Sequence, residues 1–410
     1  MKLPSLAGHP FLDAPTLKRV MYALKSEEGA TRIVGGAVRN ALLGEPVGDI
    51  DMATVLLPED VVTAAEDAGL KSVPTGIEHG TVTVIAEGHP FEVTTLRADV
   101  ETDGRHAVVR FTDDWTEDAG RRDFTLNALY CDASGHVFDP LGGYPDLAAR
   151  NIRFVGDPEE RIREDYLRIL RFFRFFAWYG DGRPDAEGLK ASSRLKAGIA
   201  VLSAERVWSE LKRLLAAPDP SRALRWMRIT GTLDKALPEN WGIDAIERVV
   251  AAERAEEIPP DPLLRLMAII PPHRSRIDQL ASRLRLARKE TERLVSWAET
   301  PEPESELSEA LLARRAYSAG RRALTDRLFL ALARDREKGD ERAAAARKRQ
   351  LAFVRDYERP TFPLTGKDLL AAGHQPGPEL GKLLNELEER WLEVDFAITR
   401  EELLALARRQ

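Results

Sequence analysis

The chain has 410 residues, of which 43% are hydrophobic and 31% are charged. This length predicts about two to four domains, and the composition is typical of a globular protein. No apolar run reaches the roughly 18 residues that a membrane-spanning helix requires, and residues 1–15 lack the apolar core of a signal peptide. The single cysteine, Cys131, excludes an intramolecular disulfide. We therefore expect a cytoplasmic protein without a membrane partner.

Charge is unevenly distributed along the chain. The formal net charge of −7 argues against a protein that coats nucleic acid in general. Residues 161–235 nevertheless contain 16 Lys and Arg against 9 Asp and Glu, a local net charge of +7. A basic segment in an acidic protein is expected for a confined RNA or phosphate site. A set of solvated helix faces would give the same count, so charge alone leaves both interpretations open.

A strand, a glycine turn and a helix are predicted near the N-terminus. Residues 31–34, TRIV, are partly β-branched, as expected for a short buried strand. Gly35-Gly36 ends this strand, and residues 37–43 suit a short helix. A glycine turn lets the backbone approach a phosphate, and a helix N-terminus offers it free N–H groups and partial positive charge. Arg39, one turn into the helix, can add a forked cationic contact.

Two aspartates, Asp49 and Asp51, follow this helix. In a strand over residues 48–54, the period of two places both carboxylates on one face. Two carboxylates at one spot repel each other, and a divalent cation relieves the repulsion. Hard oxygen ligands beside phosphates favour Mg²⁺. These elements together predict a triphosphate cradle next to a metal site, as nucleotidyl transfer requires.

A β-hairpin and a polar segment come next. Residues 81–86 and 91–96 alternate as strands do, and Glu92 is the only acid on the second strand. Residues 98–120 are polar and show no clear period, which predicts a long loop.

The string RRDFTLNA at residues 121–128 carries side chains suited to a nucleotide. Arg122 suits a phosphate, and Asp123 can accept a hydrogen bond from a ribose hydroxyl, which would help to select ribonucleotides. Asn127 can bridge backbone or sugar.

Four strings, in their order along the chain, resemble the class II branch of the nucleotidyltransferase superfamily that includes DNA polymerase beta. They are GGAVRN with DID, RRDFTLNA, DPLGGYPDL and EDYLR. This branch holds the bacterial tRNA CCA-adding enzymes and the poly(A) polymerases. The resemblance implies an α+β fold, in which an N-terminal mixed β-sheet nucleotidyltransferase head precedes an all-α neck, body and tail. Asn40 stands where the family usually has aspartate, and we expect little change because asparagine keeps the hydrogen-bonding shape.

The resemblance also implies roles for individual residues. Asp49 and Asp51 would bind two Mg²⁺ ions, and Glu92 would help to place the metals or to polarise the attacking hydroxyl. Two acids in DPLGGYPDL, Asp139 and Asp146, are expected to cap turns or hold arginines.

Residues 164–174, EDYLRILRFFR, are predicted to be a helix and resemble the family motif that reads the incoming base. Asp165 and Arg168 are three residues apart, which would make them neighbours on one face. Cytosine and adenine both present an amino donor beside an unprotonated ring nitrogen, and a carboxylate beside a guanidinium is complementary to this pair. Uracil and guanine instead present a carbonyl beside an N–H. Such a pair can accept C and A and reject U and G without a template. Arg171 and Arg174 would hold phosphate or the base platform, although a plain surface ion pair has the same spacing as Asp165 and Arg168.

From about residue 198 onward the sequence predicts helices almost throughout. Residues 334–350 are predicted to be a charged helix with a solvated face, and LTGKDLL from residue 364 resembles the family tail that grips the tRNA elbow. The predicted domains are a nucleotidyltransferase head at 1–149, a base-recognising neck at 150–215, a helical body at 216–350 and a tRNA-binding tail at 351–410.

The sequence thus predicts an enzyme that adds CCA to tRNA 3′ ends from CTP and ATP with Mg²⁺, and no protein partner can be inferred. A flexible loop at the place of residues 98–120 is linked, in CCA-adding enzymes, to the switch from adding C to adding A, and favours the complete activity. A poly(A) polymerase is the main alternative, although the basic G-R-R-F string usual in the bacterial enzymes is absent. A CC-only or A-only enzyme stays open, as does a non-enzymatic RNA-binding relative. The candidate site comprises catalytic Asp49, Asp51 and Glu92, of which the two aspartates are the metal ligands, and nucleotide-binding Gly35, Gly36, Arg39, Arg122, Asp123, Asn127, Asp165, Arg168, Arg171 and Arg174.

Overall fold

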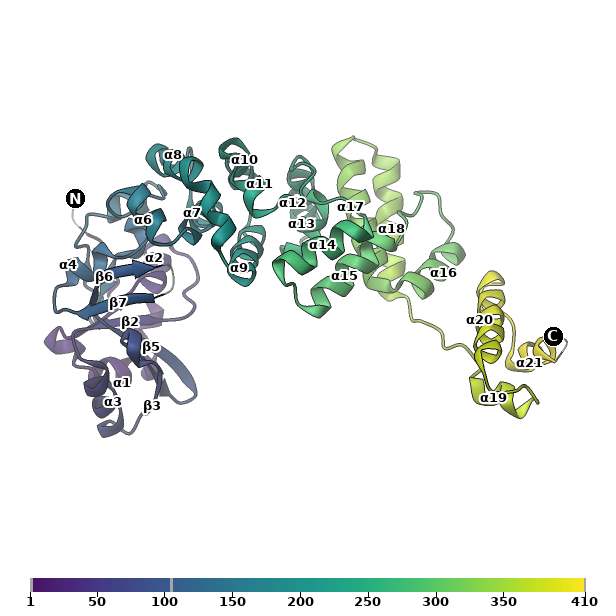
Figure 1. The fold of residues 1–410 in the computed structure, drawn as a ribbon, viewed down its shortest axis with the longest axis horizontal. Coiled ribbons are helices and arrows are strands. Elements are labelled where there is room, and N and C mark those ends of the chain that lie inside the picture. Colours follow the sequence, from purple (N-terminus) through teal and green to yellow (C-terminus); the bar gives the residue numbers. More distant parts are fainter. Residues whose placement is uncertain (1–2, 104–105, 409–410) are drawn as a thin grey trace. The chain divides into compact units, whose positions relative to one another are not determined.

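The computed structural model describes residues 3–103 and 106–408, which form two compact units (Figure 1). The first unit ends at Pro238 and combines a β-sheet with helices, whereas the second begins at Glu239 and is helical in its described residues. The predicted α+β fold with an N-terminal mixed sheet is confirmed. The finer division into head, neck, body and tail stays a prediction.

The first unit is organised around a mixed seven-stranded sheet in the order β3-β4-β5-β2-β1-β8-β9. Strands β2 and β5 pair in parallel, and the other neighbours pair antiparallel. The strands of this sheet are β1 (Thr31–Val34), β2 (Asp51–Thr54), β3 (Lys71–Gly76), β4 (Thr81–Ala86), β5 (His89–Thr95), β8 (Tyr130–Cys131) and β9 (Val137–Phe138).

Helices complete the first unit. Helices α1 and α3 both contact β4, while α7 packs against α9 and α10 (Figure 1). The helices of this unit are α1 (Pro15–Ala23), α2 (Gly36–Leu43), α3 (Pro58–Asp67), α4 (Trp115–Gly120), α5 (Tyr144–Ala148), α6 (Pro158–Glu164), α7 (Leu167–Tyr179), α8 (Ala186–Leu195), α9 (Ala204–Leu215), α10 (Ser221–Thr230) and α11 (Thr232–Ala236).

The glycine turn between β1 and α2 has the form that the sequence predicted. Ile33 and Val34 are buried in the sheet, and Gly35 follows with φ +70° and ψ −119°. A side chain would be strained at this positive φ, so glycine is required to turn the chain from the strand into the helix. Gly44, with φ +71°, ends α2 in the left-handed conformation.

The prediction of a long loop at residues 98–120 is wrong for most of the segment. Strands β6 (Arg97–Asp103) and β7 (His106–Phe111) pair antiparallel as a separate two-stranded sheet, and α4 follows. The alternation of small or β-branched residues with charged ones suits a paired strand, and the polar composition concealed this period.

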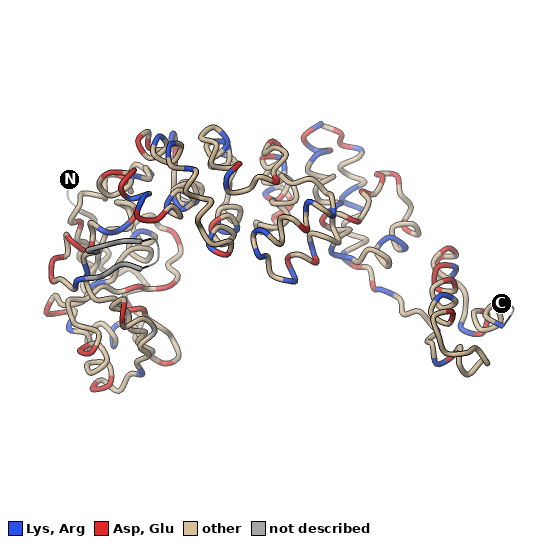
Figure 2. Tube along the Cα trace, viewed as in Figure 1, with Lys and Arg blue, Asp and Glu red and all other residues tan. Residues whose placement is uncertain are grey.

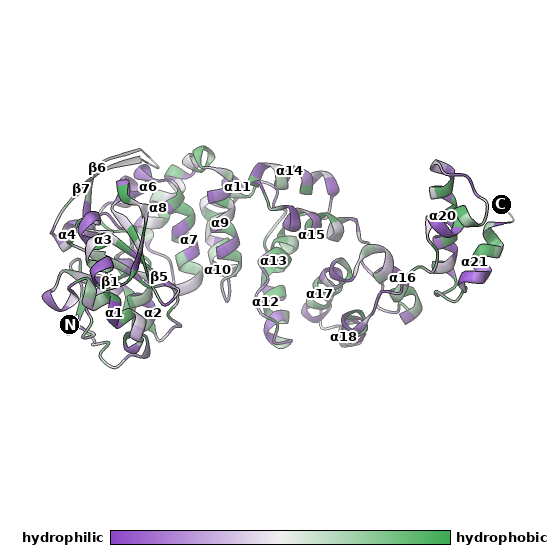
Figure 3. Ribbon diagram, turned by 90° about the horizontal axis from the view of Figure 1, so that it is seen from below, coloured by the Kyte–Doolittle hydropathy of each residue, from purple (hydrophilic) through white to green (hydrophobic). Residues whose placement is uncertain are grey.

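The second unit is built from helices that pack on one another. Charged residues of both signs alternate along them (Figure 2), and α20 shows separate hydrophobic and hydrophilic bands (Figure 3). Its helices are α12 (Ala245–Ala255), α13 (Pro262–Ile269), α14 (Arg274–Leu284), α15 (Arg288–Glu299), α16 (Glu309–Ala319), α17 (Arg321–Glu337), α18 (Glu341–Asp356), α19 (Gly366–Ala371), α20 (Pro378–Glu393) and α21 (Arg400–Ala407). In the described part of the chain, no helix has both the length and the apolar character needed to cross a membrane.

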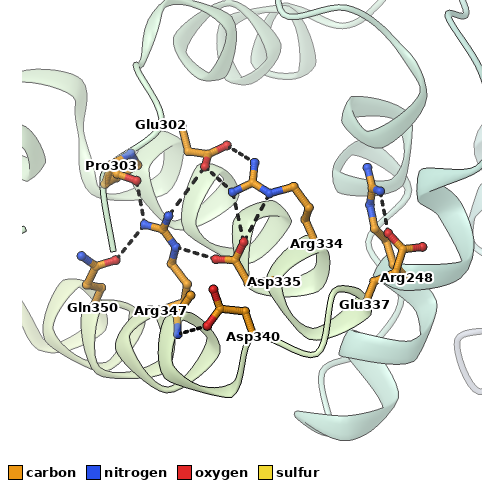
Figure 4. Close-up of polar contacts among 10 residues, drawn as sticks. Arg248, Glu302, Pro303, Arg334, Asp335, Glu337, Asp340, Arg347 and Gln350 are labelled. Carbon is orange, nitrogen blue, oxygen red and sulfur yellow. Dashed lines mark hydrogen bonds and ion pairs between the residues drawn. The ribbon is translucent and has the colours of Figure 1, made fainter. Parts of the chain in front are cut away.

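The expected single charged helix over residues 334–350 is divided between α17 and α18, and part of it is buried. Gly339, with φ +70°, lies in the turn between the two helices. Arg347 is buried and donates hydrogen bonds to Asp335 at 3.1 Å and to the carbonyl of Pro303 at 2.6 Å (Figure 4). This network fixes the segment between α15 and α16 against the two helices, so these charges are structural rather than a solvated face.

Candidate active site

One cavity of about 480 Å³ in the first unit collects most of the predicted nucleotide-binding residues. It lies among α2, β2, the 121–128 segment, α7 and α9. Its lining residues are Gly35, Gly36, Arg39, Asp51, Arg122, Asp123, Asn127, Asp165, Leu167, Arg168, Arg171, Phe175 and Arg206.

The N-terminus of α2 opens onto this cavity. Gly35 is its N-cap residue and has no side chain, so no side-chain oxygen takes the first N–H groups of the helix. These N–H groups and the positive end of the helix dipole favour a phosphate. The strand–turn–helix unit therefore has the form predicted from the Gly35-Gly36 pair, and its binding of a phosphate stays a prediction.

Three predicted carboxylates lie on or next to strands β2 and β5. Asp51 and Glu92 are register partners on these two parallel strands, and Asp49 precedes β2 by two residues. Burial and the charge of Glu92 raise the pKa of Asp51; Arg122 opposes this shift, and Asp49 adds to it. The carboxylates are thus close enough to repel one another, which is the electrostatic condition that a bound cation would relieve.

Arg122 is held by a buried carboxylate that the sequence did not single out. Its Nη2 lies 2.9 Å from Oδ2 of Asp118, which has no exposed side-chain surface. Burial by itself would raise the pKa of Asp118, but the charges of Arg122 and Arg121 hold it below its ordinary value. The hydroxyl of Tyr130 donates a further hydrogen bond of 2.8 Å to Asp118. This cluster fixes the direction in which the Arg122 guanidinium meets the cavity.

Asp123 connects the cavity wall to α7. Nε of Arg171 donates to its Oδ2 at 2.7 Å, and Nδ2 of Asn127 donates to its Oδ1 at 3.0 Å. Burial opposes ionisation of Asp123, but Arg171 and the hydrogen bond from Asn127 keep its pKa lowered. Nη1 of Arg39 in turn donates to Oδ1 of Asn127 at 2.6 Å. Four of the predicted nucleotide-binding residues therefore form one hydrogen-bonded chain, from Arg171 through Asp123 and Asn127 to Arg39.

The expected pairing of Asp165 with Arg168 on one helix face is wrong in its geometry. Helix α6 ends at Glu164, and Asp165 is extended, with φ −155°. Its Oδ1 accepts from the backbone N–H of Leu167 at 3.1 Å, at the start of α7, because aspartate favours helix N-termini over helix interiors. Its Oδ2 pairs with Arg206 at 2.6 Å, while Arg168 pairs with Glu164. Asp165 and Arg168 still line the same cavity.

Arg174 is the predicted nucleotide-binding residue that lies outside the cavity lining. Its Nε donates to Oε2 of the buried Glu210 at 2.5 Å, and its guanidinium lies 4.3 Å from the ring centre of Phe175. The first contact joins α7 to α9, and the second lies within α7, so both contacts of Arg174 stabilise the packing of the helices.

Sequence reasoning missed three lining residues, Leu167, Phe175 and Arg206. Arg206 belongs to the string ERVWSEL at residues 205–211, which lies in α9. Asp139 accepts from the backbone N–H groups of Gly143 and Tyr144, so its expected capping role is confirmed. Cys131 is buried in β8, and burial raises the pKa of its thiol to about 12.

This fold, with the N-terminus of α2 and Asp51 of β2 lining one cavity, defines a nucleotidyltransferase head. Residues 31–153 match the family described as the Poly A polymerase head domain. Residues 184–241 match the family described as the probable RNA and SrmB-binding site of polymerase A.

Similarity to characterised proteins extends over nearly the whole chain. The mitochondrial CCA tRNA nucleotidyltransferase 1 of Mus musculus is 33% identical over 403 residues, covering 95% of this chain and 89% of the relative. The CCA-adding enzyme of Geobacillus stearothermophilus is 40% identical over 238 residues, which is 57% of each protein. The structure of the Bacillus stearothermophilus CCA-adding enzyme in complex with CTP superimposes with a TM-score of 0.72 at 26% identity, covering 96% of this chain and 97% of that one. The chain belongs to the family of CCA tRNA nucleotidyltransferases.

Proposed function

We propose that this protein adds CCA to the 3′ end of tRNA, using CTP and ATP and releasing pyrophosphate. The observation that supports this proposal is a single cavity lined by the N-terminus of α2, by Asp51 of β2 and by Asp165 and Arg168. Solved relatives include CCA-adding enzymes with CTP, with ATP and with tRNA. The likeness to the last two is at 19% identity and concerns the fold alone.

Family membership implies a divalent metal, and we propose Mg²⁺. Carboxylate oxygens of Asp49, Asp51 and Glu92 are the hard donors that this ion prefers. In residues 3–103 and 106–408, no group of three or more His, Cys, Asp or Glu side chains is arranged to hold a metal by itself. The donor set therefore fits a metal that shares its coordination with nucleotide phosphates. Bound there, Mg²⁺ would neutralise phosphate charge and favour ionisation of the attacking 3′-hydroxyl.

The chain's own groups would orient the nucleotide along the cavity. The first N–H groups of α2, with Arg39 and Arg122, would bind the triphosphate. Asp123 has carboxylate lone pairs beyond those used by Arg171 and Asn127, and these can accept from a ribose hydroxyl. This alignment would leave the α-phosphate facing the Asp51 edge, where the tRNA 3′-hydroxyl attacks.

Base selection would fall to Asp165 and Arg168. Asp165 would accept a hydrogen bond from the amino group of cytosine or adenine, while Arg168 would donate to the ring nitrogen. Their present partners, Arg206 and Glu164, hold the two side chains in the cavity wall. A uracil or guanine would leave buried polar groups unmatched, at a cost of about 1–3 kcal/mol each.

A poly(A) polymerase is the second candidate, because the family matched by residues 31–153 carries that description. It shares the head chemistry and differs in the length and sequence of the product. The cytoplasmic location also stays a prediction, since the relatives from mouse, zebrafish and human are mitochondrial.

The test is incubation with tRNA lacking its CCA end, Mg²⁺ and each nucleoside triphosphate singly and together, read at single-nucleotide resolution. We expect addition of C, C and A and then a stop. Asp165→Ala is expected to incorporate U and G more readily relative to C and A, because the acceptor for the amino group is lost. A long A ladder would identify a poly(A) polymerase, a stop after CC or growth by A alone would identify a partial enzyme, and no extension would favour the RNA-binding relative.

A further inference from the structure

Arg39 differs from the other arginines of the cavity in the charge of its partners. The other four each pair with a carboxylate: Arg122 with Asp118, Arg168 with Glu164, Arg171 with Asp123 and Arg206 with Asp165. The described side chains that accept from Arg39 are instead all neutral, namely Asn40, Asn127 and Tyr179.

Tyr179 makes two of the contacts that hold this guanidinium. Its hydroxyl accepts from Nη2 of Arg39 at 2.8 Å, and the guanidinium carbon lies 4.1 Å from the centre of its ring. Burial lowers the pKa of Arg39, and the tyrosine contacts oppose that shift. A ring face attracts a cation without cancelling its charge, so Tyr179 orients Arg39 but leaves the charge to act on a ligand.

Tyr179 links two helices that contribute residues to the cavity wall. It is the last residue of α7, the helix that also carries Arg168 and Arg171, whereas Arg39 belongs to α2. Tyr179 and Arg39 are 140 residues apart in the sequence. The contact therefore joins the helix proposed to read the base to the helix proposed to bind the triphosphate.

We propose that Tyr179 is a positioning residue for the triphosphate: it holds the Arg39 guanidinium at the first turn of α2 while leaving its positive charge for the phosphates. This inference rests on the proposed function, since the anion is the nucleotide substrate. A carboxylate at this place would neutralise Arg39 and weaken its attraction for a phosphate. The neutral hydroxyl and ring face of Tyr179 orient the guanidinium without reducing its attraction for a phosphate.

The experiment measures CTP and ATP binding to the full chain by calorimetry with Mg²⁺ and without tRNA. Tyr179→Phe keeps the ring and removes the hydroxyl, and we expect its Kd for both nucleotides to rise about 3- to 10-fold, as for one lost hydrogen bond. Tyr179→Leu also removes the ring face and should raise Kd further. Tyr22→Phe is the matched control, because Tyr22 is 76% exposed on α1.

Kinetics and a double variant separate positioning from a merely structural role. In Tyr179→Phe, KM for both nucleotides should rise with Kd, while kcat at saturating nucleotide and the unfolding temperature stay as in the unaltered protein. In an Arg39→Lys background, Tyr179→Phe should have no further effect on Kd, since the hydroxyl acts only through the guanidinium.

Three results would overturn the inference. The first is an unchanged Kd in Tyr179→Phe. The second is a rise in Kd on Tyr179→Phe that is as large in the Arg39→Lys background as in the unaltered protein. The third is a fall in kcat and unfolding temperature with Kd unchanged. If the unaltered protein binds neither nucleotide, the proposed function fails and this inference fails with it.

Discussion

Replacing Asp118 with asparagine is expected to destabilise the first unit. The carboxylate lies fully buried between Arg121 and Arg122, at 2.7 Å and 2.9 Å, and accepts from the hydroxyl of Tyr130 at 2.8 Å. Asparagine keeps the shape and one acceptor oxygen. It removes the negative charge that compensates two guanidinium groups, one of which we assign to the triphosphate.

The magnitude follows from the burial of the three charged groups. Removing one partner of a buried ion pair costs about 3–5 kcal/mol. Arg121 and Arg122 keep 16% and 19% of their side-chain surface exposed, so water can solvate part of the orphaned charge. We therefore expect a loss of about 2–3 kcal/mol, which corresponds to a fall in unfolding temperature of about 4–12 °C for a unit of this size.

The effect should depend on pH in a definite direction. The pKa of Asp118 is lowered in the folded state relative to its ordinary 3.8, so its carboxylate stabilises the fold above that value and loses this effect as the pH falls below it. The difference between the unaltered protein and Asp118→Asn should be complete above about pH 5 and shrink in more acidic solution.

Scanning calorimetry from neutral to acidic pH measures this difference. Glu117→Gln is the control, since Glu117 neighbours Asp118 in α4 but keeps 39% of its side-chain surface exposed. We expect little change there. An Asp118→Asn protein as stable as the unaltered one, or a difference that stays constant into acid, would refute the reasoning.

Three further predictions concern other sites. Asp51→Asn should abolish nucleotide addition in the tRNA extension assay but keep tRNA binding, because only a proposed metal ligand is lost, and a variant that still extends tRNA would contradict this. Asn40→Asp places a negative charge beside the Arg39 guanidinium, whose side-chain partners are now neutral, so calorimetry should show a Kd for CTP and ATP raised about 3- to 10-fold. Equal affinity would support the smaller effect expected from the sequence. Arg347→Met removes one of the two guanidinium groups that contact Asp335 in the network of Figure 4, the other being Arg334 at 3.2 Å, and should cost the second unit about 1–3 kcal/mol, seen as a lower unfolding temperature; an equal loss in the exposed control Arg349→Met would argue against a specific network.

The sequence by itself determined the parts of this protein that depend on neighbouring residues. Strand β1 was predicted at its observed bounds, and the glycine turn and α2 within one residue, because a β-branched run, a Gly-Gly pair and a helix-compatible segment follow one another directly. The spacing of Asp49 and Asp51 likewise follows from a local period of two. The family motifs supplied the other candidate site residues. Those that line the cavity all lie within short sequence strings.

Tertiary structure decided which groups those residues meet. Asp165 was expected to pair three residues away, but its partner is Arg206, which lies 41 residues further along. Helix α7 starts beyond Asp165 because the aspartate side chain caps its first turn. No local pattern records that distant arginine.

The same reason explains Tyr179 and Asp118. Tyr179 and Arg39 are 140 residues apart, so their contact exists only once the sheet and helices are packed. A buried carboxylate such as Asp118 is indistinguishable in the sequence from an exposed one. The sequence therefore determined the local elements and the residue types, while packing decided which side chains the arginines of the cavity meet.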